Sequence, residues 1–186
     1  MTLRSLLRRM WSDRSGALLV EFAIAIPILL SVTLIGTDTA RMILLQQKLD
    51  RAAVTLADLA AQAESLDMTD IGNLLTAVGR IADPYPLGPQ SAIVLTSVRK
   101  PAGTSAIIDW QQVSGGLSAA SEIGVGDGAT ATLPAGFSLL DGQTVIVAEV
   151  FYELEPLFLT EFGTQSIYRR AFYRPRYVEA VTFNGG

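Results

Sequence analysis

The chain has 186 residues, of which 49% are apolar, and a net charge of −4 with neither cysteine nor histidine. This length allows one domain, or one domain with a membrane anchor. The composition excludes disulfides, thiolate catalysis and cysteine-ligated zinc, it removes the commonest general base, and its acidic balance argues against nucleic-acid binding.

The first sixteen residues form a basic segment ahead of a long apolar run. Their charged residues are Arg4, Arg8, Arg9, Arg14 and Asp13. Because positive charge beside a membrane span favours the cytoplasmic side, we expect this end of the chain to stay in the cytoplasm. Removal of residues 1–16 would leave ten basic and seventeen acidic side chains, and hence a net charge of −7.

The apolar run extends from Ala17 to Gly36, and its only charged residue is Glu21. At ~1.5 Å per residue, a helix of this length covers roughly 30 Å, the thickness of a bilayer's hydrocarbon core. A carboxylate in hydrocarbon costs up to about 2.5–3.5 kcal/mol, and a proline inside the helix, Pro27, removes one hydrogen bond. The sequence therefore predicts a transmembrane helix over residues 17–36, in which Glu21 has a partner or a function.

The beginning of this run resembles a prepilin-peptidase (class III) leader junction. The sequence reads Arg14-Ser-Gly16, then Ala17-Leu-Leu-Val, then Glu21-Phe22. Within that group it is most similar to the TadE-like pseudopilins of tight-adherence (Tad) pili. Members of that family carry Glu-Phe or Glu-Tyr at this position and often a proline shortly after, as Pro27 does here.

The resemblance implies that a membrane aspartic peptidase cuts between Gly16 and Ala17. It also implies an assembly role for Glu21, Phe22 and Pro27. The Glu21 carboxylate would pair with the new α-amine of Ala17, about 6 Å away along the helix, or with the amine of a neighbouring subunit. Two alternatives stay open: Glu21 as an interfacial residue that reaches the headgroups, and Pro27 as a tolerated kink.

Two other interpretations of the N-terminal region also stay open. A secretory signal has an apolar core of 7–15 residues and small residues three and one before the cut. The run here is longer, and a cut after Ala40 would place Asp38 where a small residue is needed. The second alternative is an uncleaved signal anchor.

Beyond Gly36 the helical pattern continues, with no proline or glycine before Ser65. Apolar residues recur there at alternating spacings of four and three, namely Leu45, Leu49, Ala52, Leu56, Leu59, Ala63 and Leu66. This seven-residue repeat predicts one apolar seam along the helix. We expect a single helix from about residue 17 to about residue 66, with its seam packed on the protein's own sheet. A two-chain coiled coil is the alternative.

A short second helix is predicted over Thr69–Ala82, with Asp67 or Thr69 as its N-cap. A proline-rich connector over residues 83–89 ends it. The following strands are predicted from alternating apolar and β-branched residues: Ala92–Val98, Ala106–Val113, Thr144–Leu154 and Ser166–Arg174. Residues 114–139 are rich in small residues and are expected to form a long loop.

These elements predict an α+β fold, in which a long N-terminal transmembrane-plus-amphipathic helix packs on a small antiparallel sheet of about four strands. Pilins share this general plan, and the strand–EPLF–turn–strand arrangement over residues 145–174 resembles the C-terminal half of TadE-like proteins. The predicted regions are a basic prepilin-type leader (1–16), the transmembrane helix (17–36), its amphipathic continuation (37–66) and a periplasmic α+β domain (67–186).

The charged residues of the C-terminal half favour a structural interpretation. Its basic cluster consists of Arg169, Arg170, Arg174 and Arg176. Arg170 and Arg174 share a strand face, and we expect Glu149 and Glu153 to lie opposite them as cross-strand pairs. Docking of an acidic partner by the cluster is the alternative.

The sequence contains no pattern typical of a catalytic or metal site. Without histidine the usual triads cannot be built. The glycine-rich segment 124–128 has one carboxylate where a calcium loop needs several, so we interpret it as a flexible loop. We therefore expect no enzyme activity, no cofactor and no metal.

Taken with the resemblance, these features predict a minor pseudopilin or membrane-anchored assembly component of a Tad-type pilus. The implied partners are a prepilin peptidase, other Tad pilins and pseudopilins, the inner-membrane assembly platform and the lipid bilayer, but no nucleic acid. The expected location is the bacterial inner membrane, crossed once, with the N-terminus cytoplasmic and the C-terminal domain periplasmic or incorporated in the pilus. The main alternative is an uncleaved, signal-anchored periplasmic interaction domain outside any fibre, and a periplasmic hydrolase is a weaker one.

Overall fold

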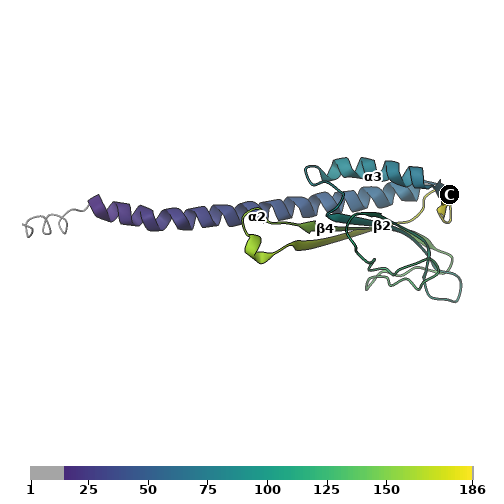
Figure 1. Cartoon of the computed structure of the whole chain (residues 1–186). Coiled ribbons are helices and arrows are strands. Elements are labelled where there is room, and N and C mark those ends of the chain that lie inside the picture. Colours follow the sequence, from purple (N-terminus) through teal and green to yellow (C-terminus); the bar gives the residue numbers. More distant parts are fainter. Residues whose placement is uncertain (1–14, 186) are drawn as a thin grey trace, which may run out of the picture.

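One long helix organises the molecule. The computed structural model describes residues 15–185. The first part of helix α2 (Ser15–Gln62), residues 15–37, projects as a stem (Figure 1). The rest of α2 packs with the remaining elements into the folded head. The 48 residues of α2 correspond to a length of about 72 Å. The predicted continuity of the helix past Gly36 is confirmed. Residues 1–14 of the predicted leader lie outside the described residues.

Helix α2 ends at Gln62, short of the predicted end near residue 66. Ser65 and Leu66 instead form the short strand β1 (Ser65–Leu66), which pairs in parallel with β6 (Thr182–Phe183) near the C-terminus. The predicted helix end was wrong, because pairing with a segment distant in sequence overrides the local helical pattern.

A four-stranded antiparallel sheet lies against the head half of α2, which confirms the α+β class. In chain order its strands are β2 (Ser91–Arg99), β3 (Ile107–Gly115), β4 (Thr144–Leu154) and β5 (Gln165–Tyr173). In space their order is β3-β2-β4-β5. The predicted strands agree with these bounds to within two residues at each end, and a short 3-10 turn, η1 (Thr160–Phe162), connects β4 to β5.

Helix α3 (Met68–Ala82) packs beside the head half of α2 (Figure 1). Of its two N-cap candidates the structure selects Asp67. The Asp70 backbone N–H donates to Asp67 Oδ1 at 2.8 Å, and the Asp67 N–H donates to Asp70 Oδ2 at 3.1 Å. This reciprocal pair satisfies two backbone donors that the first turn of a helix leaves free.

The seam of α2 packs on the protein's own sheet, as expected. Leu45, Leu49, Ala52 and Leu56 are buried in one core with apolar residues of β2, β4 and β5. The seam then shifts, because Leu59 is exposed and the neighbouring Ala60 is buried. A helix with 3.6 residues per turn drifts away from a strict seven-residue repeat, so a different residue meets the sheet after three turns.

The opposite face of the sheet carries a second, smaller core. The long loop between β3 and β4 folds across this face and contributes Ile123, Ala131 and Leu139, which are buried against Val98 and Val147. The glycine-rich segment is held by hydrogen bonds: Gln111 donates to the Gly124 carbonyl, and Gly128 N–H donates to the Ile108 carbonyl. The expectation of a long loop holds, but its role in covering the sheet was not predicted.

Burial of this face also encloses Glu149, which was expected to pair with an arginine on the neighbouring strand. Its side chain is 0% exposed, and its carboxylate accepts hydrogen bonds from Ser121 Oγ, from the Glu122 backbone N–H at 2.9 Å and from the Tyr168 hydroxyl at 2.7 Å. Burial raises the pKa of Tyr168, and the hydrogen bond to Glu149 raises it further. The hydroxyl therefore stays a proton donor at neutral pH.

The basic cluster pairs mainly with α2 rather than with β4. Arg169 Nε lies 2.9 Å from Asp50 Oδ1, and Arg176 forms an ion pair with Asp58. Arg170 is the cross-strand neighbour of Glu149, but its guanidinium lies over the rings of Tyr168 and Phe172. Arg170 thus lies opposite Glu149 as predicted, but the two form no ion pair among the described residues. The predicted pairing of Arg174 with Glu153 was wrong, because Ser166 lies opposite Glu153. Arg169 lies between the buried residues Ile167 and Ala171 on the side of β5 that faces the helix. This position brings it within reach of α2.

Candidate functional site

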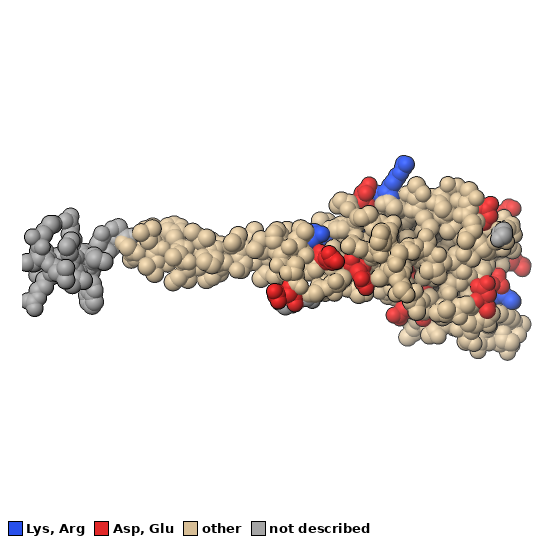
Figure 2. Space-filling model, viewed as in Figure 1, with Lys and Arg blue, Asp and Glu red and all other residues tan. Residues whose placement is uncertain are grey.

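The stem is the largest uncovered apolar surface of the described chain. Its membrane-length window has no buried residue, and it is long and apolar enough to cross a bilayer. The face of the stem that Figure 2 shows carries no charged side chain, whereas acidic and basic groups gather on the head. A surface of this kind on a helix of about 30 Å is typical of a single membrane span.

The polar side chains toward the head end of the stem satisfy themselves within the helix. The hydroxyls of Ser31, Thr33, Thr37 and Thr39 each donate to the carbonyl four residues earlier, at 2.8–2.9 Å. A hydroxyl without a partner in hydrocarbon is costly, so these internal bonds suit an apolar environment.

The structure places all five predicted site residues on the stem, away from the head. Gly16 and Ala17 lie in the first turn of α2, and α2 stays helical through Pro27. Phe22 is 55% exposed. Glu21 is exposed and has no hydrogen-bond or ion-pair partner among the described residues. Within residues 15–185, the fold thus gives Glu21 no structural task.

Where the stem enters the head, the Asp38 carboxylate binds the connection between β4 and η1, a contact that we call the Asp38 clasp. Its Oδ1 accepts a hydrogen bond from the Leu157 backbone N–H at 2.9 Å, and its Oδ2 accepts from Phe158 and Leu159 at 3.0 Å each. The side chain is 8% exposed. One carboxylate therefore satisfies three successive backbone donors from a segment about 120 residues away in sequence.

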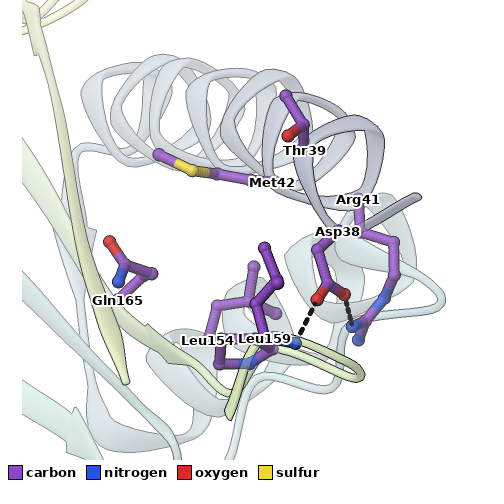
Figure 3. Close-up of a pocket in the computed structure, with 8 residues that line it drawn as sticks. Asp38, Thr39, Arg41, Met42, Leu154, Leu159 and Gln165 are labelled. Carbon is purple, nitrogen blue, oxygen red and sulfur yellow. Dashed lines mark hydrogen bonds and ion pairs between the residues drawn. The ribbon is translucent and has the colours of Figure 1, made fainter. Parts of the chain in front are cut away.

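Arg41 lies one turn after Asp38, and its Nη1 is 3.6 Å from Asp38 Oδ1. Burial raises the pKa of Asp38, but the three backbone donors and Arg41 outweigh that effect and hold the pKa below its ordinary value of 3.8. The clasp borders a mostly apolar pocket (Figure 3). The pocket is lined by Asp38, Thr39, Arg41, Met42, Leu154, Pro156, Leu159 and Gln165.

We expect Asp38→Asn to loosen the connection between β4 and η1 without unfolding the head. An amide replaces one acceptor oxygen with a donor, so at least one of the three backbone N–H groups loses its partner. A protease that cuts after glutamate should then cleave after the exposed Glu161 about fivefold faster or more at pH 7. Asp50→Asn, which removes only the ion pair with Arg169, is the control and should cleave like the wild type.

The same clasp should respond to acid. Because the folded-state pKa of Asp38 is lowered, its stabilisation is fully present above pH 3.8 and is lost as the pH falls through the lower folded value.

Equal cleavage of Asp38→Asn and wild type at pH 7 would show that the clasp does not hold the segment.

Asp38 was not predicted as a site residue, although the sequence held one signal. It precedes the seam residue Leu45 by seven positions and Ala52 by fourteen, so it continues the apolar seam as a carboxylate. A charged residue at a seam position just outside a membrane span needs a buried partner, and backbone donors of a turn can supply one.

The described residues hold no site with the composition of a metal centre. Among residues 15–185, no group of three or more His, Cys, Asp or Glu side chains lies close enough to hold a metal ion. The arrangement consists of a membrane-length helix with one exposed carboxylate, Glu21, and a head attached at its far end.

Comparison with known proteins gives one match. Residues 16–58 match the family model described as TadE-like protein. No curated protein and no solved structure matches the chain significantly. The match covers the stem and most of the seam that packs on the sheet, whereas the resemblance expected over residues 145–174 lies outside it. Over residues 16–58, the chain is therefore similar to TadE-like proteins.

Proposed function

We propose that the protein is a minor pseudopilin or membrane-anchored assembly component of a Tad-type pilus, cut by a prepilin peptidase after Gly16. The TadE-like match indicates an association with Tad pili, and the apolar stem is a candidate single-pass anchor. The head would then lie on the periplasmic side, and the stem would be available to the other pilins and to the assembly platform.

The observation that carries this proposal is the free carboxylate of Glu21 on an otherwise apolar stem. The head makes no contact with it, so no residue in the described part of the chain offsets its cost in hydrocarbon. A cut after Gly16 would create an α-amine on Ala17, one helical turn away. That amine, or the equivalent amine of a neighbouring subunit, is the ion-pair partner that the stem lacks.

An uncleaved anchor makes a different prediction for the mature chain. N-terminal sequencing of the protein extracted from membranes should give Ala17 if the proposal is right and Met1 if the protein is only anchored. An intact N-terminus in cells with an active prepilin peptidase would contradict the proposed processing.

We expect Glu21→Gln to impair assembly while leaving the head and the processing intact. Losing one partly desolvated ion pair of roughly 1–3 kcal/mol corresponds to about five- to 150-fold weaker association. The measurement is the amount of the other pilus components that co-purifies with the membrane-extracted protein, together with fibre counts.

Glu153→Gln is the matched control, because it removes the same charge from an exposed position on β4. It should assemble like the wild type. Normal partner capture and normal fibres with Glu21→Gln would show that Glu21 is only an interfacial residue.

A further inference from the structure

The segment between β4 and η1 carries apolar side chains that nothing in the described head covers. Leu157 is 57% exposed and Phe158 is 48% exposed. The segment is the green loop that lies beside α2 at the stem end of the head in Figure 1. Two large apolar residues next to each other on a short exposed loop need an apolar or amphipathic partner.

The Asp38 clasp fixes the height of this loop along the stem. The backbone nitrogens of Leu157 and Phe158 lie 2.9 and 3.0 Å from the Asp38 carboxylate oxygens. Asp38 follows Gly36 by two residues, which is about 3 Å along a helix axis. If residues 17–36 fill the hydrocarbon core, the loop therefore begins at the edge of that core.

The polar layer on each side of the hydrocarbon is about 5–8 Å thick. The two side chains thus lie at the level of the headgroups, beside the point where α2 leaves the membrane. Ile35 precedes Asp38 by three residues, so it lies on the same side of α2, and its side chain is also exposed.

We propose that Leu157 and Phe158 form a second membrane contact, which inserts into the leaflet from which α2 emerges. The inference rests on the part of the proposed function that places α2 across the bilayer, and it holds whether or not the chain is cleaved. The partner is the lipid surface itself. The contact is shallow, because exposed Glu155 and Glu161 flank the apolar pair and stay on the water side.

With a second contact, the membrane would control the orientation of the head as well as its attachment. A head on a single helix can rotate about the stem and tilt against the bilayer. With Leu157 and Phe158 anchored beside the stem, one side of the head faces the membrane. Assembly partners would then meet the protein in one orientation, in which the end of β2 and the start of β3 point away from the bilayer.

Because the chain has no cysteine, single cysteines can be labelled without background. Leu157→Cys and, separately, Phe158→Cys would carry an environment-sensitive fluorophore in the full chain, reconstituted into phosphatidylcholine vesicles. Zwitterionic lipid avoids repulsion of Glu155 and Glu161. Quenching by a mixture of lipids that bear a spin label near the headgroup or near the end of the acyl chain then reports contact with the bilayer at either depth.

Two further cysteine variants serve as the positive and the negative control for lipid quenching. Ile28→Cys is 57% exposed on the stem and reports the anchor itself. Leu140→Cys is 67% exposed and lies beside the start of β4, at the opposite end of that strand. It is therefore about 34 Å from the loop at ~3.4 Å per residue.

We expect the labels at residues 157 and 158 to show blue-shifted emission and to lose at least half as much intensity to the lipid quencher as the Ile28 label. The Leu140 label should keep its intensity. Quenching at residue 28 with none at residues 157 and 158 would overturn the second contact while leaving the anchor intact. A blue shift at residue 157 without lipid quenching would also overturn it, since a second copy would then cover the loop. No quenching at residue 28 would reject the anchor, and the second contact with it.

Discussion

Replacing Glu149 by leucine is expected to destabilise the head by about 3 kcal/mol or more. The substitution leaves Ser121 Oγ, the Glu122 backbone N–H and the Tyr168 hydroxyl without their shared acceptor. The three donors are part-buried, and each donor that loses its partner away from water costs about 1–3 kcal/mol, because leucine cannot accept a hydrogen bond. The loop between β3 and β4 should detach from the sheet first, because two of the three donors belong to it.

Glu153→Leu is the control for Glu149→Leu. It changes the same residue type on the same face of β4, but at an exposed position, and should alter stability by no more than about 0.5 kcal/mol. The measurement is urea unfolding of the full chain in detergent, followed by near-ultraviolet circular dichroism, since Trp110 is buried in the core of the head. Similar midpoints for the two variants would show that the Glu149 network contributes little.

Gly16→Phe is expected to abolish maturation. A peptidase that cuts beside Gly16 must approach its backbone closely, which a bulky side chain prevents. The folded chain itself gives no reason for a defect, because a Cβ at residue 16 would meet nothing within 4 Å. Immunoblots of cells with the prepilin peptidase should show only the uncut mass, whereas the wild type should show the shift that loss of residues 1–16 would produce.

Gly36→Phe is the matched control for processing. Residue 36 lies at the other end of the same apolar run, and a Cβ there also meets nothing within 4 Å. This variant should be cut normally, since the scissile bond and its neighbours are unchanged. If Gly16→Phe showed the normal mass shift, the assignment of the cut to Gly16 would be wrong.

Local patterns in the sequence predicted most of the fold. Strand β4 was predicted with its observed bounds, because Ile146, Ala148 and Val150 alternate with the other face and a turn precedes Thr144. The seam of α2 was visible for the same reason, since its period repeats within one helix. The membrane-length stem needed only the length and composition of the run from Ala17 to Gly36.

Contacts between distant segments could not be predicted from such patterns. Asp38 meets backbone N–H groups about 120 residues later, and backbone donors leave no trace in the side-chain sequence. Burial of Glu149 depends on a loop rich in small residues folding over the sheet. The predicted site residues Gly16 and Glu21 came from a resemblance, and the fold shows only that the head leaves them free.

The long helix also determines how the protein bears load. A pull along α2, as during extraction from a bilayer, reaches the head along the whole contact rather than at one end. The Asp38 clasp, the Asp50–Arg169 pair and the Asp58–Arg176 pair all cross that contact and lie in sequence along the helix. They are therefore loaded together, in shear, when the sheet is pulled along α2. Because β1 follows α2 almost at once and pairs with β6, the same pull also loads the β1–β6 pairing near the C-terminal end of the chain.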